Sequence, residues 1–189
     1  MKTVSLRVLP GVHRVHGLLG VHVSSPPESG EAERGSAKAE LLSASQFPSG
    51  WQELKNSSFS SAGAICPIVP LLTSSAVAQA VAFYADSGFK EIFGELIVEQ
   101  SGPASSVLSA ASRAISACKS ISPVASPLSG ITSYAWHGAF LQGSAKTSVS
   151  VALAAKGTQV LLVELQSIGP AAQGLSFGSF AGDAAAKLP

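Results

Sequence analysis

The sequence is poor in charged residues, in aromatic residues and in long apolar runs. Only 12% of its 189 residues are Asp, Glu, Lys or Arg and only 6% are aromatic, whereas charged residues usually make up about a quarter of a chain. The 12 basic and 11 acidic residues nearly cancel, which argues against a nucleic-acid partner because such proteins need a basic patch. No uninterrupted apolar stretch reaches about 18 residues, so the sequence predicts no transmembrane helix.

Serine is the commonest polar residue, with 32 copies. On the predicted helices and strands, serines stand at exposed positions that Lys and Glu usually take. One of them, Ser176, lies in a GxSxG motif between Gly174 and Gly178, the pattern of a serine-hydrolase nucleophile. That motif needs an acid and a histidine further along the chain, and no histidine follows Ser176. We therefore predict no catalytic residue, and a serine hydrolase remains only a remote alternative.

The chain divides by composition into three parts. Residues 1–23 carry Lys2, Arg7 and Arg14 before a short apolar stretch interrupted by histidines, which resembles a degenerate signal or lipoprotein-type leader. Residues 24–40 are rich in Pro, Gly and alternating charges, as in a flexible spacer. Residues 41–189 form the predicted folded domain, whose opening Phe47 and Trp51 are too large to leave exposed.

Periodicity predicts an α+β fold in which helices pack against an antiparallel sheet. Helices are expected over residues 76–85, over residues 103–121 after Pro103, and near the C-terminus. Strands are expected over residues 89–100, 131–141, 148–155 and 159–166, with one solvated face on the first of them. Residues 122–130 are expected to form a loop.

Neither a metal site nor a cofactor site is predicted. Glu91, Glu95 and Glu99 share one face of their predicted strand and have the spacing to receive a cationic ligand or a metal ion. The alternative is a solvated strand face or pairing with Lys90. His137 follows Trp136 on a strand and is expected at the surface or at the rim of a pocket.

The two cysteines are Cys66 and Cys118. Cys118 lies on the apolar face of its predicted helix, and Cys66 precedes another apolar segment. If the protein is exported, one Cys66–Cys118 disulfide is the simplest outcome. If it is cytosolic, two buried thiols are the alternative. Two cysteines without a paired histidine do not supply the four ligands of a structural metal site.

Several loose motifs together resemble the PknH-like extracellular sensor domain family of actinobacterial secreted lipoproteins and receptor kinases. They are LL…FP-x-GW from Leu41 to Trp51, Cys66-Pro67, the strand ELIVEQS, the helix PASSVLSAASRAISAC, Trp136 with Gly138, and the terminal AAAKL. The resemblance covers residues 41–188. It implies an antiparallel sheet flanked by helices, a cleft, a location outside the cytoplasmic membrane and the Cys66–Cys118 bridge. A second cysteine pair and the lipid-accepting cysteine of the family are absent from this sequence.

The expected function is therefore a secreted or cell-envelope, non-enzymatic, ligand-binding and sensor-like domain for a small or amphiphilic molecule or lipid. Tyr134, Trp136 and Phe140 are the candidate lining of its cleft, and core packing is the alternative for them. A protein-interaction module that docks a protein partner on one face of the sheet is the rival hypothesis. The rival predicts an exposed apolar patch and no deep cleft.

Overall fold

The computed structural model describes residues 37–55, 57, 68–118, 120–142, 144–169 and 176–189. Its centre is one sheet in which every neighbouring pair of strands is antiparallel, in the order β1-β2-β3-β7-β6-β5-β4. The strands are β1 (Gln52–Glu53), β2 (Ala76–Ala85), β3 (Glu91–Gln100), β4 (Ile121–Val124), β5 (Thr132–Gln142), β6 (Ala145–Lys156) and β7 (Gln159–Ile168).

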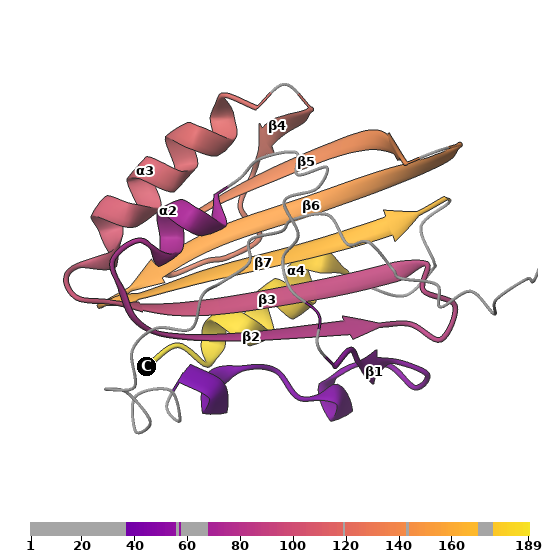
Figure 1. The fold of residues 1–189 in the computed structure, drawn as a ribbon, viewed down its shortest axis with the longest axis horizontal. Coiled ribbons are helices and arrows are strands. Elements are labelled where there is room, and N and C mark those ends of the chain that lie inside the picture. The colour runs from indigo at the N-terminus through magenta and orange to yellow at the C-terminus, as the bar shows by residue number, and fades with distance from the viewer. Residues whose placement is uncertain (1–36, 56, 58–67, 119, 143, 170–175) are drawn as a thin grey trace, which may run out of the picture.

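Helices cover both faces of the sheet. They are η1 (Ala44–Gln46), a short 3-10 helix, and the α-helices α2 (Val69–Thr73), α3 (Ala104–Ser116) and α4 (Phe177–Ala186). Figure 1 shows α2 and α3 together on one face, called here the α3 face, and α4 on the other, called here the α4 face. The predicted α+β fold with helices on an antiparallel sheet is confirmed.

The helix over residues 104–116 follows from its sequence. Pro103 stands at the N-cap position, where its missing N–H costs nothing. Apolar residues then recur at helical spacing, and Ala104, Leu108, Ala111 and Ile115 are all buried. The helix ends at Ser116, five residues before the predicted end, and the chain re-enters the sheet as β4.

The prediction of a helix over residues 76–85 is wrong, because this segment is strand β2. Its alanines favour a helix, and Val77, Ala80, Val81 and Tyr84 imitate a helical stripe. In the sheet, successive residues of β2 point to opposite faces, so that Ala80 and Tyr84 lie in the α4-face core and Phe83 lies in the α3-face core. The pairing of β2 with β3 along almost its whole length outweighs the weak intrinsic preference of these residues for a helix.

The predicted loop over residues 122–130 is also partly wrong, because β4 pairs with β5 at the edge of the sheet. Pro123 is tolerated there since an edge strand has a side without ladder hydrogen bonds. Gly138 on β5 permits the pairing, because a Cβ at this position would lie 2.2 Å from the carbonyl oxygen of Ser120. The remaining predicted strands correspond to β3, β5, β6 and β7 and are confirmed.

Two hydrophobic cores result, one on each face. The α3-face core combines Leu, Val and Ile from the sheet with Leu108 and Ile115 of α3. The α4-face core combines small sheet residues such as Ala82 and Ala152 with Ala181 of α4 and with the N-terminal segment from Ala37 to Phe47. The region described below lies on the α4 face, where the two ends of the described chain meet.

Candidate functional site

Aromatic rings fix the N-terminal segment to the α4 face. Phe47 stacks on Tyr84 of β2 with ring centroids 4.3 Å apart and on Phe180 of α4 at 4.8 Å. Trp51 stacks on Phe47 at 5.3 Å. Phe47 is buried and Trp51 is half-buried, which confirms that these two residues pack at the opening of the domain.

The face of β3 that was expected to be solvated is largely buried. Glu91, Glu95 and Glu99 do share one face, but Glu95 is fully buried, Glu91 is buried and only Glu99 is half-exposed. The expectation of a wet strand face is therefore wrong. The physical reason is that α4 and the N-terminal segment cover this face, a long-range arrangement that the alternation along β3 does not encode.

Glu95 holds the N-terminal segment through its backbone. Its Oε2 accepts a hydrogen bond from the backbone N–H of Leu42 at 2.9 Å. Burial raises the pKa of the Glu95 carboxyl to about 7, against the opposing effects of the Leu42 N–H and of the Lys187 ammonium. The side-chain hydroxyl of Tyr84 donates to the carbonyl oxygen of the same Leu42, and burial raises the pKa of Tyr84 to about 12. Leu42 is thus bound at both of its backbone groups.

A second buried carboxyl, Glu164 on β7, lies on the α3 face. Its Oε1 accepts a hydrogen bond from the side-chain amide of Gln166 on the same strand. Burial raises the pKa of Glu164 to about 7. Its register partner on β3 is Gly94, which has no side chain to fill the adjoining space. Glu164 therefore resembles Glu95 in its burial and raised pKa, but among the described residues it is hydrogen-bonded to a neighbour on its own strand.

A pocket of about 370 Å³ opens where the β6–β7 turn meets the N-terminal segment. The turn is tight, as the Lys156-Gly157 pair predicts, and Gly157 adopts a φ of 58° that favours glycine. The lining residues come from the N-terminal segment, from β2, from β3, from the turn and from the C-terminal residue: Ala37, Val77, Glu99, Lys156, Gly157, Thr158, Gln159 and Pro189.

Polar groups around this pocket are only partly satisfied by the residues that the structure describes. The side-chain amide of Gln159 donates to Glu40 Oε1 at 3.1 Å. The other oxygens of this pair, Gln159 Oε1 and Glu40 Oε2, are buried without a hydrogen-bond partner in the described part of the chain. The Lys156 ammonium donates to the carbonyl oxygen of Leu188 at 2.8 Å, and Thr158 donates to Glu99. The two hydrogen-bond acceptors Gln159 Oε1 and Glu40 Oε2 therefore lack a donor among the described residues, and a buried acceptor without a partner is costly.

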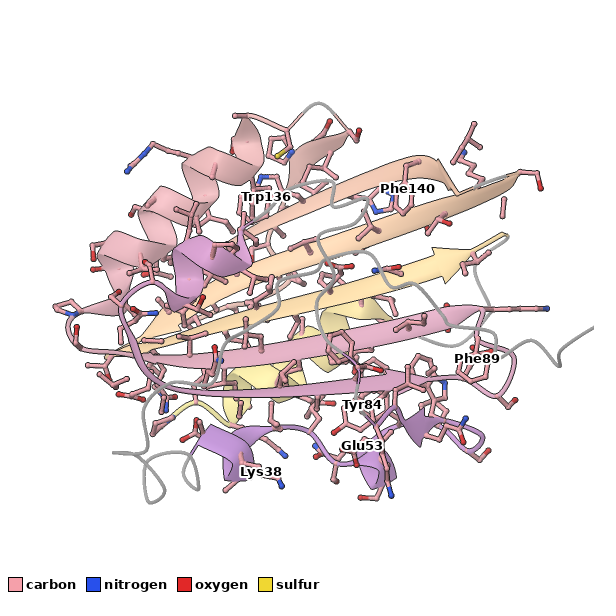
Figure 2. All side chains as sticks on the ribbon, in the orientation of Figure 1. Lys38, Glu53, Tyr84, Phe89, Trp136 and Phe140 are labelled. Carbon is pink, nitrogen blue, oxygen red and sulfur yellow. The ribbon has the colours of Figure 1, made fainter. Side chains whose placement is uncertain are left out.

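The three aromatic residues expected to line a cleft do not reach this pocket. Tyr134, Trp136 and Phe140 all lie on β5, and Figure 2 shows Trp136 and Phe140 near one edge of the sheet and Tyr84 and Glu53 near the other edge. Trp136 is buried in the α3-face core, Phe140 packs partly against it, and Tyr134 is 39% exposed. The core-packing alternative therefore describes Trp136, and the three rings do not form one exposed surface.

The remaining candidate residues lie apart from the pocket. Ser176 is the exposed N-cap of α4, and the two residues before it in the GxSxG motif, Gly174 and Leu175, lie outside the described residues. His137 is exposed, as expected, and its Nδ1 is 3.1 Å from the hydroxyl oxygen of Ser150. Nothing in the described chain links Ser176 to His137 by a hydrogen bond.

Of the two cysteines in the predicted disulfide, only Cys118 lies in the described part of the chain. Cys118 follows α3 and packs against the α3-face core, as its place on the apolar face of the helix indicates. Cys66 lies outside the described residues, as do the predicted leader and most of the predicted spacer, so the Cys66–Cys118 pairing stays a prediction. Residues 37–40 of the spacer region are helical, and Ala37 belongs to the α4-face core.

The described residues contain neither a membrane-spanning helix nor a metal-binding group. None of the described helices is long and apolar enough to cross a membrane. Nowhere in the described ranges do three or more His, Cys, Asp or Glu side chains come together in a group that would hold a metal ion.

Comparison with known proteins gives little. No family model matches the chain, and no curated protein matches it. Among solved structures, it is similar to the X-ray structure of an uncharacterised protein from Mycobacterium smegmatis, with 14% sequence identity and a TM-score of 0.37. The likeness covers 58% of this chain and 64% of that one. The resemblance to the PknH-like family therefore stays a hypothesis.

The sequence reasoning missed Tyr84, Gln159 and Glu164. The sequence pattern places Tyr84 in a helical stripe. Its contact with Leu42 is also not visible in the sequence, because the two residues are 42 positions apart in the chain. Gln159 and Glu164 are polar residues that flank the continuous apolar run of residues 160–163 in β7. That contrast was the available signal, because a polar side chain inside an otherwise apolar strand needs a partner.

Proposed function

We propose that this chain is a non-enzymatic, sensor-like domain that binds a small molecule outside the cytoplasmic membrane. The pocket beside Gln159 carries the proposal, because its volume of about 370 Å³ falls in the range of small-molecule sites, roughly 300–1,000 Å³. Ordered strands and a tight turn supply most of its walls. The resemblance to the PknH-like family supports the sensor-like role and the exported location.

The chemistry of the pocket favours a ligand that offers hydrogen-bond donors. The two buried polar atoms beside the pocket that have no partner among the described residues, Gln159 Oε1 and Glu40 Oε2, are both acceptors. A hydroxyl or ammonium group on the ligand would satisfy them. Ala37 and Val77 supply apolar surface next to these acceptors, which suits a small amphiphilic envelope molecule with one polar end.

Two valines on β2 provide a matched pair of variants for the test. Val77 and Val81 are both 45% exposed, but only Val77 lines the pocket. Val77→Trp fills the pocket with an indole ring, whereas Val81→Trp adds the same ring outside it. We expect native mass spectrometry of protein purified from its own host to detect a bound small molecule in the wild type and in Val81→Trp. We expect Val77→Trp to lose it.

The outcomes separate the hypotheses. A small-molecule adduct retained equally by both tryptophan variants would place the ligand elsewhere and overturn the pocket assignment. Wild-type protein that carries no small molecule from its own host would overturn the ligand-binding proposal itself.

A protein-interaction module is the second candidate, and the edge of the sheet favours it. Leu141 of β5 is 74% exposed and Val124 of β4 is 50% exposed. Leu141 lies beyond the part of β5 that pairs with β4. In this alternative, Leu141→Ser abolishes binding of a protein partner and Val77→Trp leaves it intact. The remote hydrolase alternative is rejected if any hydrolytic activity survives Ser176→Ala.

A further inference from the structure

Residues 37–42, called the strap, are held on the α4 face by three side chains from three separate elements. Glu95 of β3 accepts from the N–H of Leu42 at 2.9 Å, and Tyr84 of β2 donates to the carbonyl oxygen of Leu42. The Lys187 ammonium, just after α4, donates to the carbonyl oxygen of Leu41 at 2.6 Å. Two successive strap residues are therefore fixed by polar contacts rather than by burial of large side chains alone.

The other end of the strap forms part of the pocket. Ala37 lines it, and the Glu40 carboxylate accepts a hydrogen bond from Gln159, another lining residue. Glu40 is separated from Leu42 by one residue. The strap therefore connects Leu42, which Glu95 holds, to the side of the pocket that Ala37 lines.

Glu95 is unfavourably placed as a carboxylate when the strap is closed. It is fully buried, and its Oε1 has no hydrogen-bond partner among the described residues. A proton on Oε1 removes the buried charge and still leaves Oε2 free to accept from Leu42. Burial accordingly raises the pKa of Glu95 to about 7 from the ordinary 4.5, and exposure on opening would return it toward the ordinary value.

Other ionisable groups around Glu95 affect the pKa values in this part of the molecule. Lys187 favours the carboxylate and lowers the pKa of Glu95, while the charges of Glu95 and Glu53 raise the pKa of Tyr84. Glu91 and Glu99 share the same face of β3, and Glu40 lies in the strap itself. On β7 and β2 the register partners of Glu95 are the uncharged Val163 and Ala82.

We propose that the strap is a movable wall of the pocket and that protonation of Glu95 keeps it closed. The closed state binds the proton more tightly than the open state, so a rise in pH shifts the strap toward opening. The consequence for the ligand rests on the proposed function, whereas the opening itself is a property of the protein without ligand. A domain outside the cell would thereby couple access to its pocket to the pH of its surroundings.

Hydrogen exchange of the ligand-free protein tests the strap directly. Peptides that contain residues 40–47 are compared at about pH 6 and about pH 8.5, with rates corrected for the intrinsic effect of pH on exchange. Linkage between a pKa of about 7 in the closed state and about 4.5 in the open state predicts that protection falls about tenfold over this interval. Peptides from β6 should change less.

Glu164→Gln is the matched control, because Glu164 is a second buried carboxyl whose pKa is raised to about 7 but which lies on the α3 face. We expect Glu95→Gln to abolish the pH dependence of strap protection and Glu164→Gln to retain it. Tyr84→Phe, which removes one contact to Leu42 without touching the carboxyl, should lower strap protection at both pH values and preserve the tenfold change.

Two results would overturn the inference. One is strap protection that is independent of pH in the wild type. The other is loss of the pH dependence in Glu164→Gln as complete as in Glu95→Gln. If Glu95→Gln does not fold, the wild-type protein and Tyr84→Phe still decide the question. A strap that opens with pH in a protein that never carries a ligand would leave this inference standing and overturn the proposed function alone.

Discussion

The two faces of the sheet are built in different ways. The α3 face is filled by large aliphatic side chains and Trp136 beneath an amphipathic helix. The α4 face is rich in alanine on both the sheet and the helix, and beside aliphatic residues such as Ile97 and Leu161 it carries a cluster of aromatic rings around Phe47. Ala37, Leu42 and Phe47 of the N-terminal segment complete this core beside α4.

The elements that cover the two faces are therefore held in place by different kinds of contact. On the α3 face, α3 packs against the sheet through its apolar stripe, which includes Leu108 and Ile115. On the α4 face, the strap is positioned by polar groups, Glu95, Tyr84 and Lys187, that reach its backbone. Polar contacts to backbone are easier to open than a packed aliphatic core, so the movable part of the molecule is expected on the α4 face.

The largest expected effects come from truncating one core residue on each face. Phe47→Ala removes the ring that joins the N-terminal segment to Tyr84 and Phe180 and should cost about 3–5 kcal/mol. Leu108→Ala on the α3 face should cost about 2–5 kcal/mol. Urea unfolding measures both free energies. Only Phe47→Ala should also increase exchange of the strap amides, and equal strap exchange in the two variants would contradict the separation of the faces.

The predicted Cys66–Cys118 bridge would strengthen the α3 face alone. A disulfide that closes about 53 residues should contribute about 2–4 kcal/mol. Cys118→Ser should lower the free energy of unfolding by this amount in oxidised protein and leave strap exchange unchanged. Non-reducing mass spectrometry is the check, and two free thiols on protein secreted through an oxidising compartment would reject the bridge.

The two buried carboxyls predict an unusual dependence of stability on pH. For Glu95 and Glu164, the pKa is raised in the folded protein from 4.5 to about 7. The folded state therefore binds more protons than the unfolded state between these values, and stability should fall as pH rises from about 4.5 to above 7. Each group contributes at most about 3 kcal/mol.

Thermal unfolding at a series of pH values measures this effect in single and double variants. Glu95→Gln and Glu164→Gln should each remove part of the slope, and the double variant should remove most of it. Glu53→Gln, at an exposed position on β1, is the control and should keep the wild-type slope. Stability that increases from pH 5 to pH 8 in the wild type would show that these carboxyls are ionised at little cost.

The smallest expected effect is at the edge of the sheet. In Gly138→Ala, the new Cβ would lie 2.2 Å from the carbonyl oxygen of Ser120 and 2.5 Å from the side chain of Ile121. The backbone of β4 must then move, at a cost of about 1–3 kcal/mol. Amide exchange should increase in β4 and remain unchanged in the strap. An unaltered β4 would mean that this edge is more adaptable than its close contact indicates.

The sequence predicted what depends on local patterns. The stripe through Leu108 and Ile115 gave α3, and alternation gave β6 and β7. Where alanine replaced β-branched residues, as in β2, the local pattern pointed to a helix and the strand was recognised only from its pairing with β3.

The candidate site was hidden for a different reason. Its parts come from residue 37, from the middle of the chain and from the β6–β7 turn, and the hydrogen bond between Glu40 and Gln159 joins residues 119 apart. A strand face with a glutamate at every fourth residue, as at positions 91, 95 and 99, looks solvated unless one knows what covers it. The aromatic residues on β5 are predicted to line a cleft, whereas in the structure Trp136 fills the α3-face core.

Native-state hydrogen exchange of the wild type at one pH tests the difference between the two faces most directly. Exchange is followed for the strap and for the central strands β3 and β7 while urea is added below the unfolding transition. If the strap is a movable wall held by polar contacts, its amides will exchange through an opening that needs less free energy than global unfolding and depends little on urea. If strap and strands exchange with the same free energy and the same urea dependence, the α4 face opens only when the whole domain unfolds.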